Sequence, residues 1–332
     1  MKKNLFKRIT PFAMAALMLL AVGCKTAPVN DAAQEIAPER VELSAEPVED
    51  ASGVDHSSLY AVDGVTEESS GETYASDTAN VNTVLVQNAG QLTMISADIN
   101  KSGDSSGDFS GGQNAAVAVL SKGQMTLDES NITTNALGCF GAIVAGEGSL
   151  LSMRGTFVYT SGDSSPALVV RDGGKADVVG GTLSSEGADA PCLLLAKGTV
   201  SLTGVTLSSQ GGEILRVLAG ENELTLDQTS MNAAPIIEEE AMLALHLLNG
   251  ASFTGELGGM LPAKANVYLD AASRLVLGAE TYLGVLVNAD LTHANIESNG
   301  FNLYYDSNAP ENAYLAGQSF MLPGGGFLAP II

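Results

Sequence analysis

Three carboxylates recur at one position of a repeated pattern, and their types and spacing could bind a cation. Asp163, Asp189 and Glu213 each lie 15 residues after a turn glycine. If the repeats stack like neighbouring strands, about 5 Å apart, these like charges repel unless solvent or a cation lies between them. A row of carboxylate oxygens suits Ca²⁺, which takes six or more oxygen ligands. The alternative is a solvated acidic edge, which the lack of regular Asp-Gly spacing favours.

A longer copy of the same turn carries two further acids. The stretch KSGDSSGDFSGGQN repeats SGDSS, in which Gly and Ser allow the backbone freedom of a turn that closes each repeat. It adds about eight residues, among them Asp104, Asp108 and Phe109. Longer loops on one edge of a stacked repeat often form the binding face. We expect Lys101–Gln113 to protrude. It is either a ligand-binding loop or a tolerated insertion, and the low cost at which surface loops accept length favours the insertion.

The sequence lacks the residue patterns of the common catalytic sites. No Gly-rich phosphate loop leads from a strand into a helix, no Cys/His cluster has metal-ligand spacing, and the three His are scattered. Two carboxylates about 5 Å apart would suit a glycoside hydrolase, and Arg154 or Arg171 could be the base or the substrate clamp of a lyase. Sugar clefts are usually lined by aromatic rings, however, and the chain has no Trp. We therefore expect no enzymatic activity and keep a polysaccharide lyase or hydrolase as the alternative.

An internal repeat positions these side chains. From Ser57 onward, segments recur in which apolar residues lie two, four and nine positions after a small turn residue. The turn residues are Gly90, Gly123, Gly148, Gly174, Gly198, Asn222 and Ser273. Alternation at positions two and four predicts a strand with one buried face, and the apolar residue at position nine needs a bend before it. Each unit therefore consists of several short strands joined by turns.

Units of about 24 to 26 residues suit the coils of a right-handed parallel β-helix, which stack to share one core. No six-residue period indicates a left-handed helix, and β-propeller blades are longer, at about 40 residues. We predict an all-β fold, a right-handed parallel β-helix (β-solenoid) of about eight or nine coils. Its predicted caps are Ser57–Thr78 and Phe320–Ile332, and the register near residues 235–265 stays open.

Two cysteines fall within this repeat. Cys192 aligns with an inward-facing residue, and Cys139 lies in a turn two coils earlier. Two coils span about 10 Å, which is beyond the reach of a disulfide. We predict free thiols, with Cys192 in the core.

The N-terminus predicts export and a lipid anchor. The basic MKKNLFKR precedes an apolar run of roughly a dozen residues, the pattern of a secretory signal and too short for a stable spanning helix. Ala21-Val22-Gly23-Cys24 resembles the lipobox of bacterial lipoproteins. The resemblance implies cleavage before Cys24, lipidation of its sulfur and attachment to a membrane. In bacterial lipoproteins, Asp after the cysteine is typical of retention at the inner membrane. Because Lys25 follows Cys24 here, the resemblance also implies that the protein is located at the outer membrane or the cell surface of the bacterial envelope.

Three regions follow from these signals. Residues 1–23 are the expected signal peptide, residues 24–56 an acidic tether without sustained periodicity, and residues 57–332 the solenoid. Removal of residues 1–23 takes away four of the 15 Lys and Arg and none of the 38 Asp and Glu. So acidic a chain argues against nucleic acid as a partner.

The repeat region also resembles the β-helix surface proteins of bacteria that are called adhesin-like, which share the pectate-lyase-like solenoid. The resembling stretches are SGETYASDTANVNTVLV, INKSGDSSGDFSGGQNAAVAV, ITTNALGCFGAIVAGEGS, LLNGASFTGELGG, NGFNLYYDSNAPENAYLAG and LPGGGFLAP. The resemblance implies a β-helix and export, and it carries over no catalytic or binding residues. Together with the lipobox it predicts a lipid-anchored binding or structural scaffold for glycan or surface-protein ligands.

Overall fold

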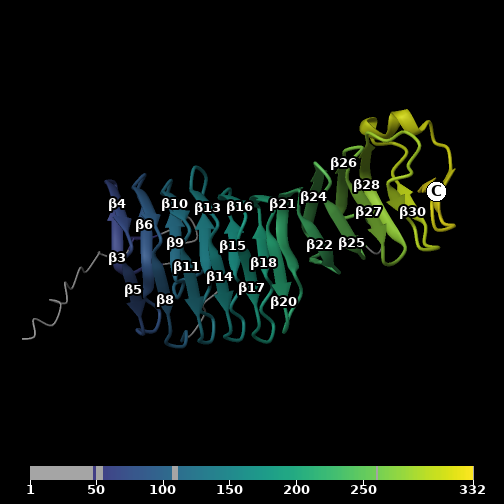
Figure 1. The fold of residues 1–332 in the computed structure, drawn as a ribbon. Coiled ribbons are helices and arrows are strands. Elements are labelled where there is room, and N and C mark those ends of the chain that lie inside the picture. Colours follow the sequence, from purple (N-terminus) through teal and green to yellow (C-terminus); the bar gives the residue numbers. More distant parts are fainter. Residues whose placement is uncertain (1–47, 50–54, 107–110, 259–260, 332) are drawn as a thin grey trace, which may run out of the picture. The chain divides into compact units, whose positions relative to one another are not determined.

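The computed structural model describes residues 48–49, 55–106, 111–258 and 261–331. They form a right-handed parallel β-solenoid of about 11 coils, which confirms the predicted fold class (Figure 1). The predicted signal peptide, Cys24 and most of the tether lie outside this part of the chain. Asp108 and Phe109 lie outside it too.

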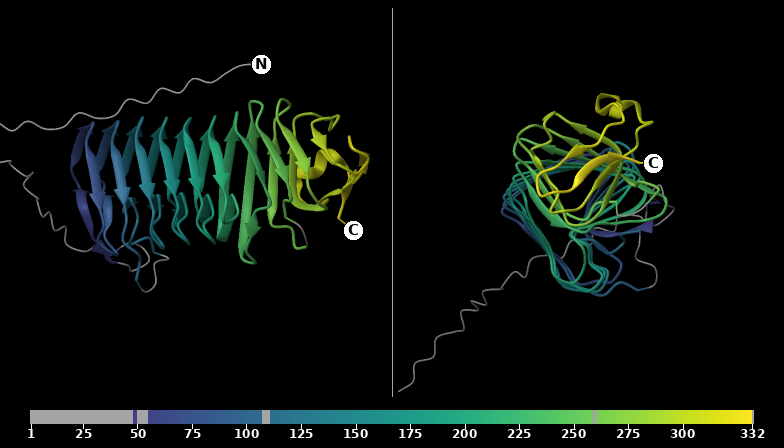
Figure 2. Two further views of the ribbon diagram at one scale, coloured as in Figure 1. Left: turned by 60° about the horizontal axis from the view of Figure 1, so that its bottom comes forward. Right: turned by 90° about the vertical axis from the view of Figure 1, so that its right-hand side faces the viewer.

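Successive coils add strands to the same faces of the solenoid, and the strands within a face run parallel. Figure 2 shows the solenoid from two further sides. Face 1 comprises β3 (Ser58–Asp63), β6 (Asn82–Gln87), β9 (Val117–Leu120), β12 (Ala142–Ala145), β15 (Leu168–Arg171), β18 (Leu193–Ala196), the start of β21 (Leu215–Asp227) and β23 (Ile236–Ile237). Face 2 comprises β4 (Thr66–Ser70), β7 (Gln91–Ile95), β10 (Gln124–Asp128), β13 (Leu150–Arg154), β16 (Lys175–Val179), β19 (Thr199–Thr203), the rest of β21, β24 (Ala241–Leu248), β26 (Ala265–Leu269), β28 (Thr281–Asn288), β30 (Leu303–Tyr305) and β32 (Phe327–Pro330).

The third side consists of two sheets, one after the other along the chain. The first, face 3, comprises β5 (Thr73–Ser76), β8 (Asp98–Lys101), β11 (Asn131–Thr134), β14 (Phe157–Thr160), β17 (Thr182–Ser185) and β20 (Thr206–Ser209). The second comprises β22 (Ser230–Ala233), β25 (Ser252–Gly255), β27 (Arg274–Leu277) and β29 (Ile296–Glu297). Outside the parallel ladders lie β1 (Val48–Glu49), β2 (Asp55–His56), the 3₁₀ helix η1 (Pro310–Leu315) and β31 (Phe320–Met321).

The predicted apolar rows fill the interior. Position two of the repeat is buried in successive coils of face 2, and so is position four. The buried residues at these positions include Leu92, Met94, Met125, Leu127, Ala176, Val178, Val200, Leu202, Leu224 and Leu226. A single coil could not bury its apolar residues by itself. The core is continuous because neighbouring coils stack and cover one another's apolar residues.

One unit was predicted one residue out of register. Strand pairing sets Gln124 opposite Leu150, so Ser149, and not Gly148, occupies the position of Gly123. The side chains inside are therefore Leu151, Met153 and Val158. The predicted Leu150, Ser152 and Phe157 are not buried, and Phe157 is 55% exposed. The cause is one extra residue in the turn between Ala145 and Leu150, which alignment on a glycine cannot detect.

The coil count and part of the C-terminal register differ from the prediction. The segment predicted as an N-terminal cap forms the first coil, with β3, β4 and β5, and further coils follow residue 280, which together explain the low predicted count. Leu275 and Leu277 belong to β27 and are paired with β25, not with face 2. Tyr282, expected at position nine, lies on face 2 and stacks on Tyr304, with ring centroids 4.7 Å apart.

The first coil ends the apolar core with a polar layer. The inward positions of this coil hold Tyr60, Glu67, Ser69 and Tyr74. Their partners in the next coil are Val84, Leu92, Met94 and Ile99. Tyr60 donates to Glu67, and the hydroxyls of Ser69 and Tyr74 lie 2.8 Å apart. Burial, followed by this bond to Glu67, raises the pKa of Tyr60. Polar groups at an open solenoid end discourage stacking on another chain.

We expect the double substitution Glu67→Leu and Ser69→Met to cause self-association through this end. The two new side chains copy Leu92 and Met94 of the next coil and make the terminal layer apolar. Sedimentation velocity should show dimers or larger species as the main component. The matched control is Glu68→Leu with Ser70→Met, since both residues of that pair are exposed. Equal association of the two double variants, or none of either, would contradict a capping role.

Both cysteines of the described region are free, as predicted, and both are buried, which was predicted for Cys192 alone. Cys192 lies in the core, and burial raises the pKa of its thiol to about 12. Burial also raises the pKa of Cys139, to about 11. Cys139 accepts a hydrogen bond from Asn114 Nδ2 at 2.9 Å. Both thiols are therefore protonated and unreactive at neutral pH.

Candidate functional site

The predicted acidic edge divides into two unlike sets of carboxylates. Asp104 and Asp163 each occupy the third position after a face 3 strand. Asp104 accepts a hydrogen bond from the backbone N–H of Leu137 at 3.0 Å, and Asp163 accepts one from Ala188 at 2.8 Å. In both cases the donor lies in the next coil. These two acids therefore link neighbouring coils.

Asp189 and Glu213 share one cation. Arg216 Nη2 lies 2.6 Å from Asp189 Oδ1, and Arg216 Nε donates to Glu213. Burial alone would lower the pKa of Arg216, but the hydrogen bonds to Glu213 and Asp189 outweigh it and raise that pKa. The sequence prediction missed Arg216, because it considered only the acids of this edge.

Asp163 lies outside the row that Asp189 and Glu213 form. Asp189 and Glu213 each lie four residues after the paired strand ends Ser185 and Ser209, whereas Asp163 lies three residues after the corresponding Thr160. Within the described residues no group of three or more His, Cys, Asp and Glu side chains could hold a metal ion. Calcium binding at Asp104, Asp108, Asp163, Asp189 or Glu213 stays a prediction.

The long turn packs against its neighbours in the part that the structure describes, where it was expected to protrude. Ser105 donates from its backbone to Leu137 O and from its hydroxyl to Gly138 O. Lys101 is only 2% exposed, and its Nζ donates to the carbonyls of Thr78 and Ser102. Burial lowers the pKa of this lysine. The segment up to Ser106 is thus tied into the solenoid.

A large apolar hollow lies on the outer side of face 1. This outer pocket, of about 550 Å³, extends over β15, β18 and β21. Its apolar wall is formed by Phe140, Pro166, Val169, Pro191, Leu194, Ala196, Leu218 and Ala219. Its polar groups are Ser164, Arg171, Asp172, Asp189, Lys197 and Arg216. An apolar hollow with a few converging polar groups is the usual form of a binding site.

Basic residues gather at this pocket. Six of the chain's 15 Lys and Arg lie in residues 1–47, and three of the remaining nine line the pocket. Arg171 Nε lies 2.7 Å from Asp172 Oδ2, and Arg216 bridges Asp189 and Glu213. The side chain of Lys197 is exposed and forms no hydrogen bond or ion pair with any described residue. The pocket thus gathers three cations, and acids of the protein pair with both arginines.

The lining residues are better suited to binding than to catalysis. The lining holds no His and no Cys, and the hydroxyl of Ser164 forms no side-chain hydrogen bond with a described residue. Its two carboxylates are both paired with arginines. A general acid or base must reach the substrate and exchange a proton with it, which an ion-paired carboxylate does poorly.

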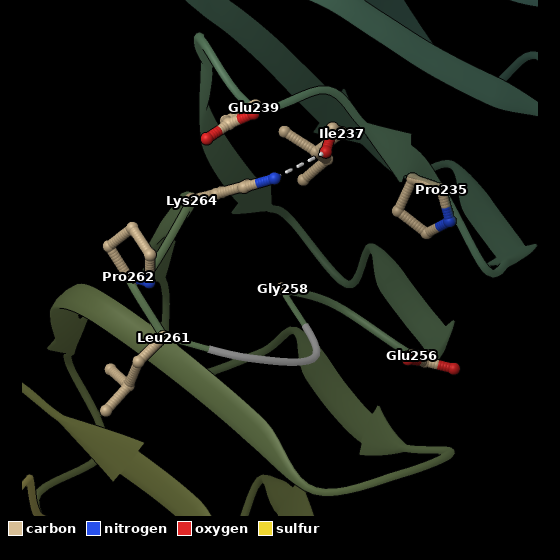
Figure 3. A pocket seen from close by; sticks show the side chains of 8 residues that line it. All are labelled: Pro235, Ile237, Glu239, Glu256, Gly258, Leu261, Pro262 and Lys264. Atoms are coloured by element: carbon tan, nitrogen blue, oxygen red, sulfur yellow. Dashed lines mark hydrogen bonds between the residues drawn. The ribbon is translucent and has the colours of Figure 1, made fainter.

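A second hollow lies near the C-terminal coils, as Figure 3 shows. It has a volume of about 380 Å³ and is lined by Pro235, Ile237, Glu239, Glu256, Gly258, Leu261, Pro262 and Lys264. Lys264, the one cation of this lining, donates from Nζ to Ile237 O at 3.2 Å. In Figure 3 the Glu256 side chain points away from Lys264. The lining therefore offers no cluster of converging polar groups.

Comparison with protein-family models, curated proteins and solved structures finds no match to this chain. In the part of the chain that the structure covers, no helix has the length and apolarity to cross a membrane.

Proposed function

We propose that this chain is a lipid-anchored protein of the bacterial envelope that binds a glycan or protein ligand at the outer pocket. The observation that carries the proposal is the pocket itself, an apolar hollow of about 550 Å³ bordered by Arg171, Lys197 and Arg216. Solvent-facing strands normally carry polar side chains, so an accessible apolar hollow indicates an interaction site.

The solenoid supports this role by holding the pocket rigidly. β15 and β18 are each hydrogen-bonded to a neighbour on both sides, so their side chains keep fixed spacings along the solenoid. A preorganised surface loses little conformational entropy when a ligand binds. Anchoring at Cys24 would hold this surface at the membrane, at the end of the acidic tether.

The experiment measures retention of the mature chain on immobilised bacterial and host polysaccharides and surface proteins, with and without calcium. Released sugar fragments are measured in the same samples. We expect retention without fragments, and we expect Leu194→Asp to weaken it at least about tenfold, which corresponds to about 1.4 kcal/mol. The matched control is Val179→Asp on the outer side of face 2, because Val179 is 49% exposed and lies away from the pocket.

Retention that responds equally to both substitutions would overturn the assignment of the pocket. Release of fragments would instead support the alternative function, a polysaccharide lyase or hydrolase. Asp172 and Asp189 would then be the first catalytic candidates, because both line the pocket. Calcium-dependent retention would assign the acidic edge to ligand binding.

A further inference from the structure

The outer side of face 1 carries an unusual apolar row. In register, the row consists of Leu85, Ala118, Ile143, Val169, Leu194 and Arg216. Its members up to Val169 are at most 1% exposed, although they face away from the solenoid core and form a separate apolar cluster. A row that points outward and is buried must be covered by other parts of the protein.

The chain itself covers part of this row. Gly112 packs so closely on Ile143 that a Cβ atom at Gly112 would lie 2.5 Å from Ile143 Cδ1. β6, β9 and β12 are buried at every residue, on both of their sides. The cover ends toward the C-terminus, where Leu194 is half-buried and Leu218 is 39% exposed. The outer pocket is therefore the uncovered continuation of a surface on which the turn around Gly112 already packs.

We propose that the outer pocket docks an extended peptide segment of a partner protein, in which aliphatic side chains alternate with carboxylates. This inference rests on the proposed binding function and narrows it to a protein ligand of stated chemistry. Aliphatic side chains of the segment lie on Leu194 and Leu218, as the backbone of Gly112 lies on Ile143.

The lining favours a peptide over a sugar chain. Phe140 is the one aromatic residue of the pocket and is only 5% exposed, so its ring offers no open face on which a sugar could stack. The exposed apolar surface is aliphatic, which suits aliphatic side chains. Because β15 and β18 are paired on both edges, the segment cannot add to the sheet as a strand and must be bound through its side chains.

One cation of the pocket favours a carboxylate in the segment. Arg171 is paired with Asp172, and Arg216 with Asp189 and Glu213, so these two arginines are already matched by acids of the protein. The side chain of Lys197 is exposed, forms no hydrogen bond or ion pair with a described residue and is the group most open to a carboxylate of the segment. Attraction of an acidic segment by Lys197 falls as salt rises, since exposed charges are screened.

The test selects a displayed library of random decapeptides on the mature protein. We expect enrichment of peptides in which Leu, Val or Ile alternates with Glu or Asp. Lys197→Glu should weaken the binding of a selected peptide by about tenfold or more, as Leu194→Asp should. The control Lys175→Glu makes the same charge change at an exposed residue of face 2 and should leave the affinity unchanged. Circular dichroism confirms that each variant is folded.

A second arm titrates the same proteins with oligogalacturonate, which carries carboxylates on sugars. Binding of this oligosaccharide that Lys197→Glu abolishes, without selection of acidic peptides, would overturn the inference and leave the binding function in place. Selected peptides that lack acids, or that bind Lys197→Glu as well as the unchanged protein, would also overturn it. If no ligand class responds to Leu194→Asp, both the inference and the proposed binding function are wrong.

Discussion

Gly187→Ala is expected to lower the free energy of unfolding by about 3 kcal/mol or more. A Cβ atom at Gly187 would lie 1.8 Å from the carbonyl oxygen of Gly162 in the preceding coil. The same close approach recurs in neighbouring coils. A Cβ atom at Gly162 would lie 1.9 Å from Ala136 O, and one at Gly211 would lie 2.2 Å from Gly187 O. The clash is with backbone, so the coils would have to separate and break the hydrogen bonds between them.

The matched control for this prediction is Gly204→Ala. Gly204 has φ +61° and no heavy atom within 4 Å of its hypothetical Cβ, so alanine there causes only the strain of a left-handed backbone, about 1 kcal/mol. Chemical denaturation followed by circular dichroism measures both variants. Equal destabilisation by the two substitutions would show that the close approach between coils is not the reason why residue 187 must be glycine.

Cys24→Ser is expected to remove the protein from the membrane altogether. Serine lacks the sulfur that the lipobox resemblance assigns to the lipid, and the remaining chain is strongly acidic. Without acyl chains it has no strong attraction to an anionic lipid surface. Labelling with radioactive palmitate and separation of membrane from soluble fractions measure the effect.

The control for the anchor is Lys25→Asp. This variant keeps Cys24 and should still incorporate palmitate, but the resemblance implies that Asp after the cysteine retains the protein at the inner membrane. A Cys24→Ser protein that still sediments with membranes and incorporates palmitate would contradict the lipidation of Cys24.

The solenoid could be predicted from the sequence because its repeat is enforced by the core. Each coil must place apolar residues at the same inward positions, which leaves a period that can be counted. Register within a coil is less visible, since one extra turn residue before Leu150 shifts every inward position by one. The turn glycines were predicted for backbone freedom, whereas Gly162, Gly187 and Gly211 are required by the close approach of neighbouring coils.

The outer pocket was harder to predict, because the repeated signal in the sequence was a row of acids along one edge. The outer pocket is formed by aliphatic residues of face 1 and by cations from different coils, which strand register brings together. A signal for it was present in VAVL, AIVA, LVVR and LLLA, which are apolar almost throughout instead of alternating. Uninterrupted apolar strands indicate that both sides are covered. Arg216 could not be paired with Asp189 and Glu213 without the turn geometry.

The most direct test of binding at the outer pocket is photo-crosslinking on intact bacteria. A photoreactive p-benzoylphenylalanine replaces Leu194 in the pocket in one strain and the exposed Val179 on face 2 in another. After irradiation, we expect a discrete higher-mass adduct of the protein from the strain altered at Leu194 and none from the strain altered at Val179. An adduct at Val179 without one at Leu194 would contradict the assignment of the outer pocket as the binding surface.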